Sequence, residues 1–158
     1  MSEAQFLELV EQNQGIIYKL VALYARDAEE KKDLYQEILL YAWKGWPGFR
    51  GESSFSTWLY RISINSIFTH RRKRRRVDYT GTLDDHPAQV PHSSVQQEEA
   101  LRLQQAIRQL SEIDRAVISF HLDGFGNPEI AEMLGITINH VAVKLHRCKQ
   151  QVSNLLKQ

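Results

Sequence analysis

The stretch GNPEIAEMLGITINHVAVKLHRCKQQV, residues 126–152, decides how the C-terminal half of the chain folds. Asn127 is placed to cap a short helix, and Pro128 suits the first position of that helix. Gly135 supplies the left-handed backbone that ends it, and Thr137 then caps a second, longer helix. A short helix, a tight turn and a longer helix in this order predict a helix-turn-helix.

The second helix of this motif has two different faces. Apolar residues recur at helical spacing and predict a buried stripe, formed by Val141, Leu145, Cys148, Val152 and Leu155. The opposite face combines hydrogen-bonding and basic groups with no acid: Asn139, His140, Val143, Lys144 and Arg147. Such a face suits the major groove of DNA, with the residues near the helix start placed to read base edges. A plain helical hairpin with a solvated basic face is the alternative interpretation.

Helical spacing extends to the rest of the chain. We expect helices over residues 3–25, 28–44, 95–109, 112–123, 127–134 and 138–156, with a further long helix from about residue 56. Gly15 is the expected break in the first of these, and no segment alternates long enough to predict a strand. Residues 77–94 lack periodicity and are rich in Pro, Asp, Ser and Thr, which indicates a flexible linker. The sequence therefore predicts an all-α protein of two small helical domains, residues 1–76 and 95–158.

A second candidate nucleic-acid surface precedes that linker. Ser56 or Thr57 is placed to cap the long helix that ends in the basic run 71–76. One face of this helix carries Trp58, Arg61, Asn65 and Arg72, and the loop before it carries Trp46, Phe49, Arg50, Ser53, Ser54 and Phe55. Aromatic rings beside cations suit unpaired bases, because every base offers a face to stack on and a phosphate to neutralise. Trp43, Trp46 and Phe55 also fit the core, and the basic run also fits a solvated helix end.

The net charge of +1 conceals an uneven distribution of charge. Residues 41–76 carry nine Lys and Arg against one Glu, and residues 136–158 carry four against no acid. The stretches 1–40 and 77–135 are both acidic overall. Two basic islands separated by about 60 residues indicate two separate contacts with a polyanion.

Composition also limits the class of protein. No apolar run approaches the roughly 20 residues that span a bilayer, and the lone Cys148 suits the reducing cytoplasm. His140, Lys144 and Cys148 share helical spacing, but no second His or Cys cluster completes a metal site, so we expect no metal or other cofactor. Paired carboxylates, a glycine-rich phosphate loop and a catalytic triad are missing from the sequence. We therefore expect neither an enzyme nor a small-molecule substrate.

Two longer stretches make the chain recognisable. DLYQEILLYAWKGWPGFRGESSFSTWLYRISINSIFTHRRKRRR, residues 33–76, closely resembles region 2 of extracytoplasmic-function sigma factors. The helix-turn-helix, with LSEIDRAVISFHLDGFGNPEIAEMLGI leading into it, resembles region 4 of the same family. The likeness covers nearly the whole chain, in the order of the family and with a linker where the family has one. It implies a cytoplasmic sigma factor that takes core RNA polymerase to promoter DNA.

The resemblance also implies a role for each surface. Asp33, Gln36 and Glu37 would dock on the clamp helices of the polymerase β′ subunit, and region 4 would meet the β flap. Minus-ten DNA would be held by Arg50, Ser53, Ser54, Phe55, Trp58, Arg61, Asn65, Arg71 and Arg72. The minus-thirty-five duplex would be read by Asn139, His140, Val143, Lys144 and Arg147. The family also implies an anti-sigma factor, often membrane-anchored, that masks these surfaces.

Several positions depart from the family pattern. Leu39 stands where an aromatic residue is usual, and Lys31 and Lys32 stand where acids are common. Asn139 and His140 replace a frequent Gly and Thr, so the minus-thirty-five sequence does not follow from the resemblance. A helix-turn-helix regulator without a sigma role remains the main alternative. A nucleic-acid hydrolase and a single-strand RNA-binding protein are weaker ones.

Overall fold

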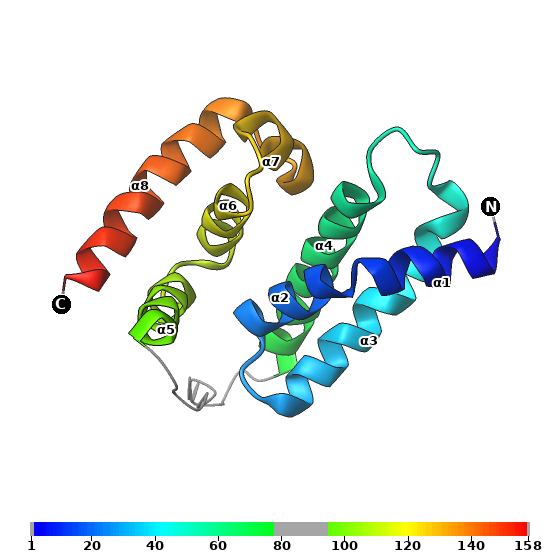
Figure 1. Ribbon diagram of the computed structural model, residues 1–158, viewed down its shortest axis with the longest axis horizontal. Coiled ribbons are helices and arrows are strands. Elements are labelled where there is room, and N and C mark those ends of the chain that lie inside the picture. The colour runs from blue at the N-terminus through cyan, green and yellow to red at the C-terminus, as the bar shows by residue number, and fades with distance from the viewer. Residues whose placement is uncertain (1, 78–94, 158) are drawn as a thin grey trace. The chain divides into compact units, whose positions relative to one another are not determined.

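The computed structural model describes residues 2–77 and 95–157, and every regular element within these ranges is a helix (Figure 1). The chain divides into two compact units, Met1–His86 and Pro87–Gln158. The predicted all-α fold of two helical domains is therefore confirmed. The predicted linker, residues 77–94, lies outside the described residues except for Val77, which ends a helix. Within the described ranges, no helix is both long and apolar enough to cross a membrane.

The first unit is a bundle built around its last helix. Its elements are α1 (Glu3–Gln12), α2 (Gln14–Tyr24), α3 (Ala28–Gly45), the 3-10 turn η1 (Trp46–Gly48) and α4 (Phe55–Val77). Figure 1 shows α4 lying along α2 and α3. The core where these helices meet contains the fully buried Ile17, Leu20, Leu34, Ile38, Leu59, Ile64 and Ile67. Apolar burial on this scale is what keeps the short helices together.

Two details of the first unit differ from the sequence-based expectation. The first helical stretch breaks at Asn13 and not at Gly15, because the Asn13 side chain donates to the carbonyl of Leu9 at 2.7 Å and ends α1. The predicted cap at Ser56 or Thr57 is wrong. α4 begins at Phe55, and the Ser54 hydroxyl accepts the backbone N–H of Thr57 at 3.2 Å. The carbonyl of Ser54 also accepts the backbone N–H of Trp58 at 3.1 Å, so the cap lies at Ser54.

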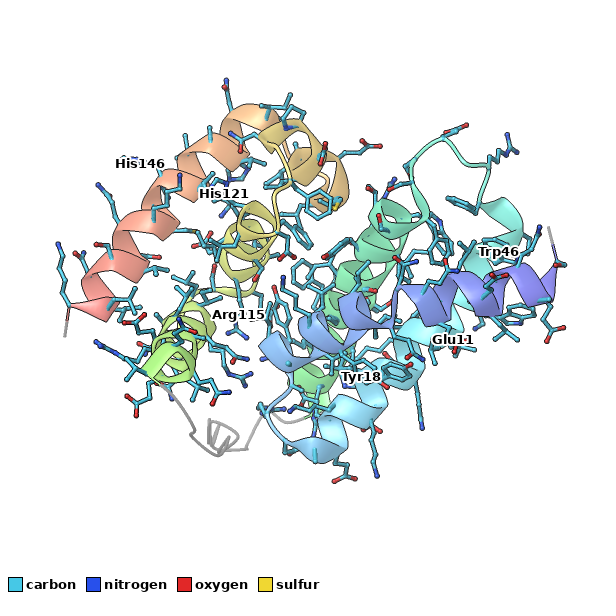
Figure 2. The ribbon with its side chains drawn as sticks, viewed as in Figure 1. Glu11, Tyr18, Trp46, Arg115, His121 and His146 are labelled. Atoms are coloured by element: carbon cyan, nitrogen blue, oxygen red, sulfur yellow. The ribbon has the colours of Figure 1, made fainter. Side chains whose placement is uncertain are left out.

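The second unit consists of α5 (Val95–Arg108), α6 (Glu112–Leu122), α7 (Asn127–Leu134) and α8 (Ile138–Leu156). α8 packs against the other three through its apolar stripe, of which Val141, Leu145, Cys148 and Val152 are buried and Leu155 is half-buried. The guanidinium of Arg115 (Figure 2) donates to the carbonyls of Arg108 at 2.7 Å and Leu110 at 3.3 Å. These bonds satisfy the open end of α5 and join it to α6.

The helix-turn-helix forms as α7 and α8. Gly135 ends α7 with a left-handed φ of 70°, and Thr137 accepts the backbone N–H of His140 at 3.0 Å to cap α8, as expected. Asn127 is not the cap of α7. That position belongs to Gly126, whose extended backbone directs its carbonyl to the N–H of Ile130 at 3.0 Å and leaves Asn127 inside the first turn. The cap therefore lies one residue earlier than predicted, whereas the helix has the predicted bounds.

Candidate nucleic-acid interface

The aromatic residues before and at the start of α4 pack against one another. The rings of Trp46 and Phe49 are stacked with centroids 5.6 Å apart, and Trp58 lies 5.2 Å from Phe49 and 5.4 Å from Phe55. Trp46 (Figure 2) and Phe55 are buried, as the core alternative expected, whereas Trp43 is 44% exposed. The cluster therefore acts first as a support for the loop. Its half-buried members Phe49 and Trp58 are the rings that remain accessible.

The polar residues of this loop differ in their freedom to contact DNA. Arg50 is exposed, and Ser53 is half-buried. Ser54 is exposed, but its hydroxyl also lies 3.1 Å from that of Ser56 and 2.9 Å from that of Thr57, in addition to its capping bond. Gly51 adopts a φ of 75°, which only glycine takes without strain, and so turns the loop back towards α4. The loop is thus held by its own serine cap and by the ring cluster.

The outer face of α4 carries an exposed polar stripe. Arg61, Asn65 and Arg72 are all exposed along it, and Trp58 lies at its start. Asn65 also borders an open hollow of about 200 Å³, whose other lining residues are Tyr41, Ile62, Ser66 and Thr69. A side-chain amide beside a hollow of this size can offer both a donor and an acceptor to a planar base.

Arg71 does not lie on that stripe. Its guanidinium donates to the backbone carbonyl of Tyr24 and pairs with Glu30 at 3.2 Å. Glu30 is not a predicted site residue, because an acid in the first turn of a helix normally indicates only a favourable interaction with the helix dipole. Its partners on α4, Arg71 and Arg74, lie more than 40 residues away in sequence, so no local pattern predicts these contacts.

The candidate docking residues lie on α3. Asp33 and Gln36 are exposed, while the Glu37 carboxylate is half-buried and accepts from Nδ1 of His70 on α4 at 3.2 Å. Gln36 also lines an open groove between α3 and α1, together with Leu40 and Trp43. Leu40 is 50% exposed, so this face is more apolar than the three predicted residues suggested.

The outer face of α8 presents four of its five predicted residues to solvent. Asn139, His140, Val143 and Arg147 are exposed. Lys144 differs from the expectation because its side chain is only 19% exposed, and its ammonium lies 3.3 Å from the carboxylate of Asp114 on α6. His146, which was not predicted, is also exposed on this helix (Figure 2).

Cys148 lies on the buried side of α8. Burial, followed by the nearby carboxylate of Asp114, raises the pKa of the Cys148 thiol to about 11, although Lys144 opposes the shift. The thiol donates to the backbone carbonyl of Asp114 at 3.6 Å. It therefore stays protonated at neutral pH and behaves as a core residue. Among the described residues, no group of three or more His, Cys, Asp and Glu could hold a metal ion.

The two units together define the class of protein. One unit carries an aromatic and basic surface suited to unpaired bases, and the other is a helix-turn-helix with an exposed polar and basic helix. This is a two-domain, all-helical nucleic-acid-binding architecture. Comparison with known proteins shows to which family this architecture belongs.

The family model described as Sigma-70 region 2 matches residues 9–77, and the model for Sigma-70, region 4 matches residues 100–152. The chain belongs to the sigma-70 family, within its extracytoplasmic-function group. It is 29% identical over 153 residues to the ECF RNA polymerase sigma factor SigM of Mycobacterium tuberculosis, covering 96% of this chain and 76% of SigM. It is 28% identical over 163 residues to the RNA polymerase sigma-H factor of Pseudomonas aeruginosa, covering 94% of this chain and 84% of the relative.

A solved structure shows the same fold. The sigma factor RpoE of Bartonella quintana, crystallised in complex with the anti-sigma factor NepR, matches with a TM-score of 0.75 and 24% identity. The match covers 97% of each chain. The fold expected from the resemblance is therefore found in an experimental structure of a sigma factor.

Proposed function

We propose that the chain is an alternative sigma factor of the extracytoplasmic-function type, which binds core RNA polymerase in the cytoplasm and directs promoter-specific initiation. The observation that carries this proposal is the presence of both sigma modules, in family order, on one chain whose two units each expose polar and basic side chains along one helix. The role is one of recognition, and we propose no catalytic step for it.

The α3 face is proposed to dock on the β′ clamp helices. Asp33 and Gln36 supply exposed polar groups. Leu40 and Trp43 supply apolar surface that is exposed in the free chain and that a partner would bury. An apolar centre with a polar rim is the usual composition of a protein interface. Glu37 contributes less freely, because it is already bonded to His70 on α4. Region 4 is proposed to meet the β flap.

The first unit is proposed to hold the minus-ten strand. Arg61 and Arg72 are exposed to neutralise phosphates, and Asn65 borders a hollow in which a base can be contacted. Arg50, Ser53 and the half-buried ring of Trp58 complete this surface. Phe55 and Ser54 act mainly by supporting the loop, since Phe55 is buried and Ser54 caps α4.

The second unit is proposed to read the minus-thirty-five duplex through α8. Asn139, His140 and Val143 lie near the start of the helix, which enters deepest into a major groove, and are assigned to base edges. Arg147, a turn further on, is assigned to the phosphate backbone. Lys144 joins them only if its bond to Asp114 opens.

An anti-sigma factor is the proposed regulatory partner, and the support comes from fold similarity. RpoE of Bartonella quintana was crystallised with an anti-sigma factor, and CnrH, with a TM-score of 0.70, was solved with the cytosolic domain of CnrY. A partner of this kind would cover the exposed α3 face and so compete with core polymerase.

The alternative is a helix-turn-helix regulator that acts without polymerase. Fluorescence anisotropy of a labelled promoter duplex separates the two functions when the duplex is titrated with the chain alone, with core polymerase alone and with both. We expect sequence-specific binding only when both are present. Equal specific affinity for the chain with and without core would support the regulator and reject the sigma role.

A further inference from the structure

The side chain of Glu30, in the first turn of α3, is a buried carboxylate surrounded by arginines. It is only 1% exposed. Its Oε2 lies 3.3 Å from Nε of Arg26 and 2.7 Å from Nη1 of Arg74, and its Oε1 lies 3.2 Å from Nη1 of Arg71. A buried charge persists only when partners of opposite sign compensate for lost hydration. Here the compensation comes from two residues of α4 and one that precedes α3.

Arg71 adds further contacts at the same corner. Its guanidinium donates to the carbonyl of Tyr24, at the end of α2, and lies 6.0 Å from the centre of the Tyr24 ring. That ring also packs against the ring of Phe68 of α4 in a T-shaped arrangement, with the ring centroids 5.9 Å apart. An ion pair, a hydrogen bond to the backbone and ring contacts therefore attach the second half of α4 to the corner between α2 and α3.

The attachment divides the basic run of α4 into two groups. Arg71 and Arg74 face the buried carboxylate, with 19% and 38% of their side chains exposed. Arg72 and Lys73 are exposed instead. Eleven residues complete almost a whole number of helical turns, so Arg72 continues the face that Arg61 begins. The side chains of residues 75 and 76 lie outside the described part of the chain.

We propose that Glu30 is a positioning residue for promoter binding, and this rests on the proposed sigma function. By holding Arg71 and Arg74, it fixes the end of α4 so that Arg72 and Lys73 face the DNA. Arg71 and Arg74 then anchor the helix and do not contact phosphate. An arginine that is paired with a buried carboxylate does not neutralise a phosphate, so it releases no counterion from the DNA and adds little to the salt dependence of binding.

Two neighbouring arginines provide a matched test. Promoter affinity of the holoenzyme is measured across a series of salt concentrations for the wild type, Arg72→Gln and Arg74→Gln. Loss of one phosphate contact reduces the slope of log affinity against log salt by about one. We expect this reduction for Arg72→Gln. Arg74→Gln should keep the wild-type slope but lower the affinity equally at every salt concentration, because the loosened helix must be ordered on binding and then makes the same phosphate contacts. An equal reduction for both variants would overturn the division of the run.

The second arm measures the anchoring directly, by amide hydrogen exchange in α4 of the full chain without polymerase. Glu30→Gln and Arg74→Gln should each raise exchange of the last described turns of α4 at least tenfold. The double variant should exchange little faster than either single one, since both remove the same contact. Glu30→Asp, which keeps the charge, should recover part of the protection.

Unchanged exchange in Glu30→Gln would overturn the proposal. Failure of the wild-type holoenzyme to bind a promoter would instead count against the sigma function. The two failures are distinguishable because amide exchange requires neither polymerase nor DNA.

Discussion

Lys144 lies on α8, the helix that we propose faces DNA, yet its charge is already matched by Asp114 on α6 at 3.3 Å. We predict that Asp114→Asn raises the affinity of holoenzyme for promoter DNA and steepens its salt dependence by about one phosphate contact, because Lys144 becomes free to bind DNA. Adding Lys144→Ala to this variant should remove the gain. Identical affinity and slope in the wild type and Asp114→Asn would show that the ion pair does not restrain Lys144.

Cys148 gives a prediction about pH. Its thiol has a pKa of about 11 in the folded chain, above the ordinary value of 9.0 that applies when the chain unfolds. The unfolded state therefore loses its proton first as pH rises, and the contribution to stability, intact below pH 9, disappears between about pH 9 and 11. Urea unfolding of the second unit, followed by circular dichroism, should show this fall in the wild type and less of it in Cys148→Ala. Equal pH dependence in both proteins would contradict the assignment.

The role of Ser54 as the cap of α4 can be tested in the absence of DNA, by measuring the stability of the first unit. Ser54→Ala removes the hydroxyl that accepts the Thr57 N–H and should cost about 0.5–2 kcal/mol of stability. Ser53→Ala, one residue earlier, should cost much less. All three tryptophans of the chain lie in the first unit, so their fluorescence during urea unfolding reports on this unit alone. Equal stability of the two variants would reject the cap.

The exposed apolar face of α3 leads to a docking prediction. Leu40→Glu places a charge where the proposed polymerase contact is apolar, so it should weaken core binding at least tenfold without unfolding a half-exposed site. Leu122→Glu, at an exposed leucine of the other unit, is the matched control and should bind core normally. Core affinity can be measured by titration of labelled protein. Wild-type affinity of Leu40→Glu would remove this face from the interface.

The sequence predicts a feature correctly when the residues that form it lie close together along the chain. The turn at Gly135, the cap at Thr137 and the buried stripe of α8 follow from residues a few positions apart, and all three are present. The contacts of Glu30 with Arg71 and Arg74, and the ion pair of Lys144 with Asp114, join residues 30 or more positions apart, on different helices. Local spacing does not encode such contacts, so Arg71 and Lys144 were predicted as if they were free on the surface.

On the scale of the whole molecule, two small units carry two separate basic surfaces. Each unit alone has a modest core, and binding of both to a polymerase and a promoter would favour the ordered state by mass action. The proposal requires that one chain serve both ends of a promoter, with α8 at the duplex and α4 at the melted strand. Transcription needs both surfaces and polymerase, whereas simple DNA binding needs only α8.

Reconstituted transcription from a promoter library, with core RNA polymerase in the presence or absence of this chain, tests the sigma function most directly. We predict transcripts that appear only when the chain is added and that start from a narrow set of related minus-ten and minus-thirty-five sequences. His140→Ala should alter the minus-thirty-five sequences in that set, whereas Arg147→Ala should lower the yield from all of them. The absence of chain-dependent transcripts, from a chain that is folded and binds duplex DNA by itself, would contradict the proposed function.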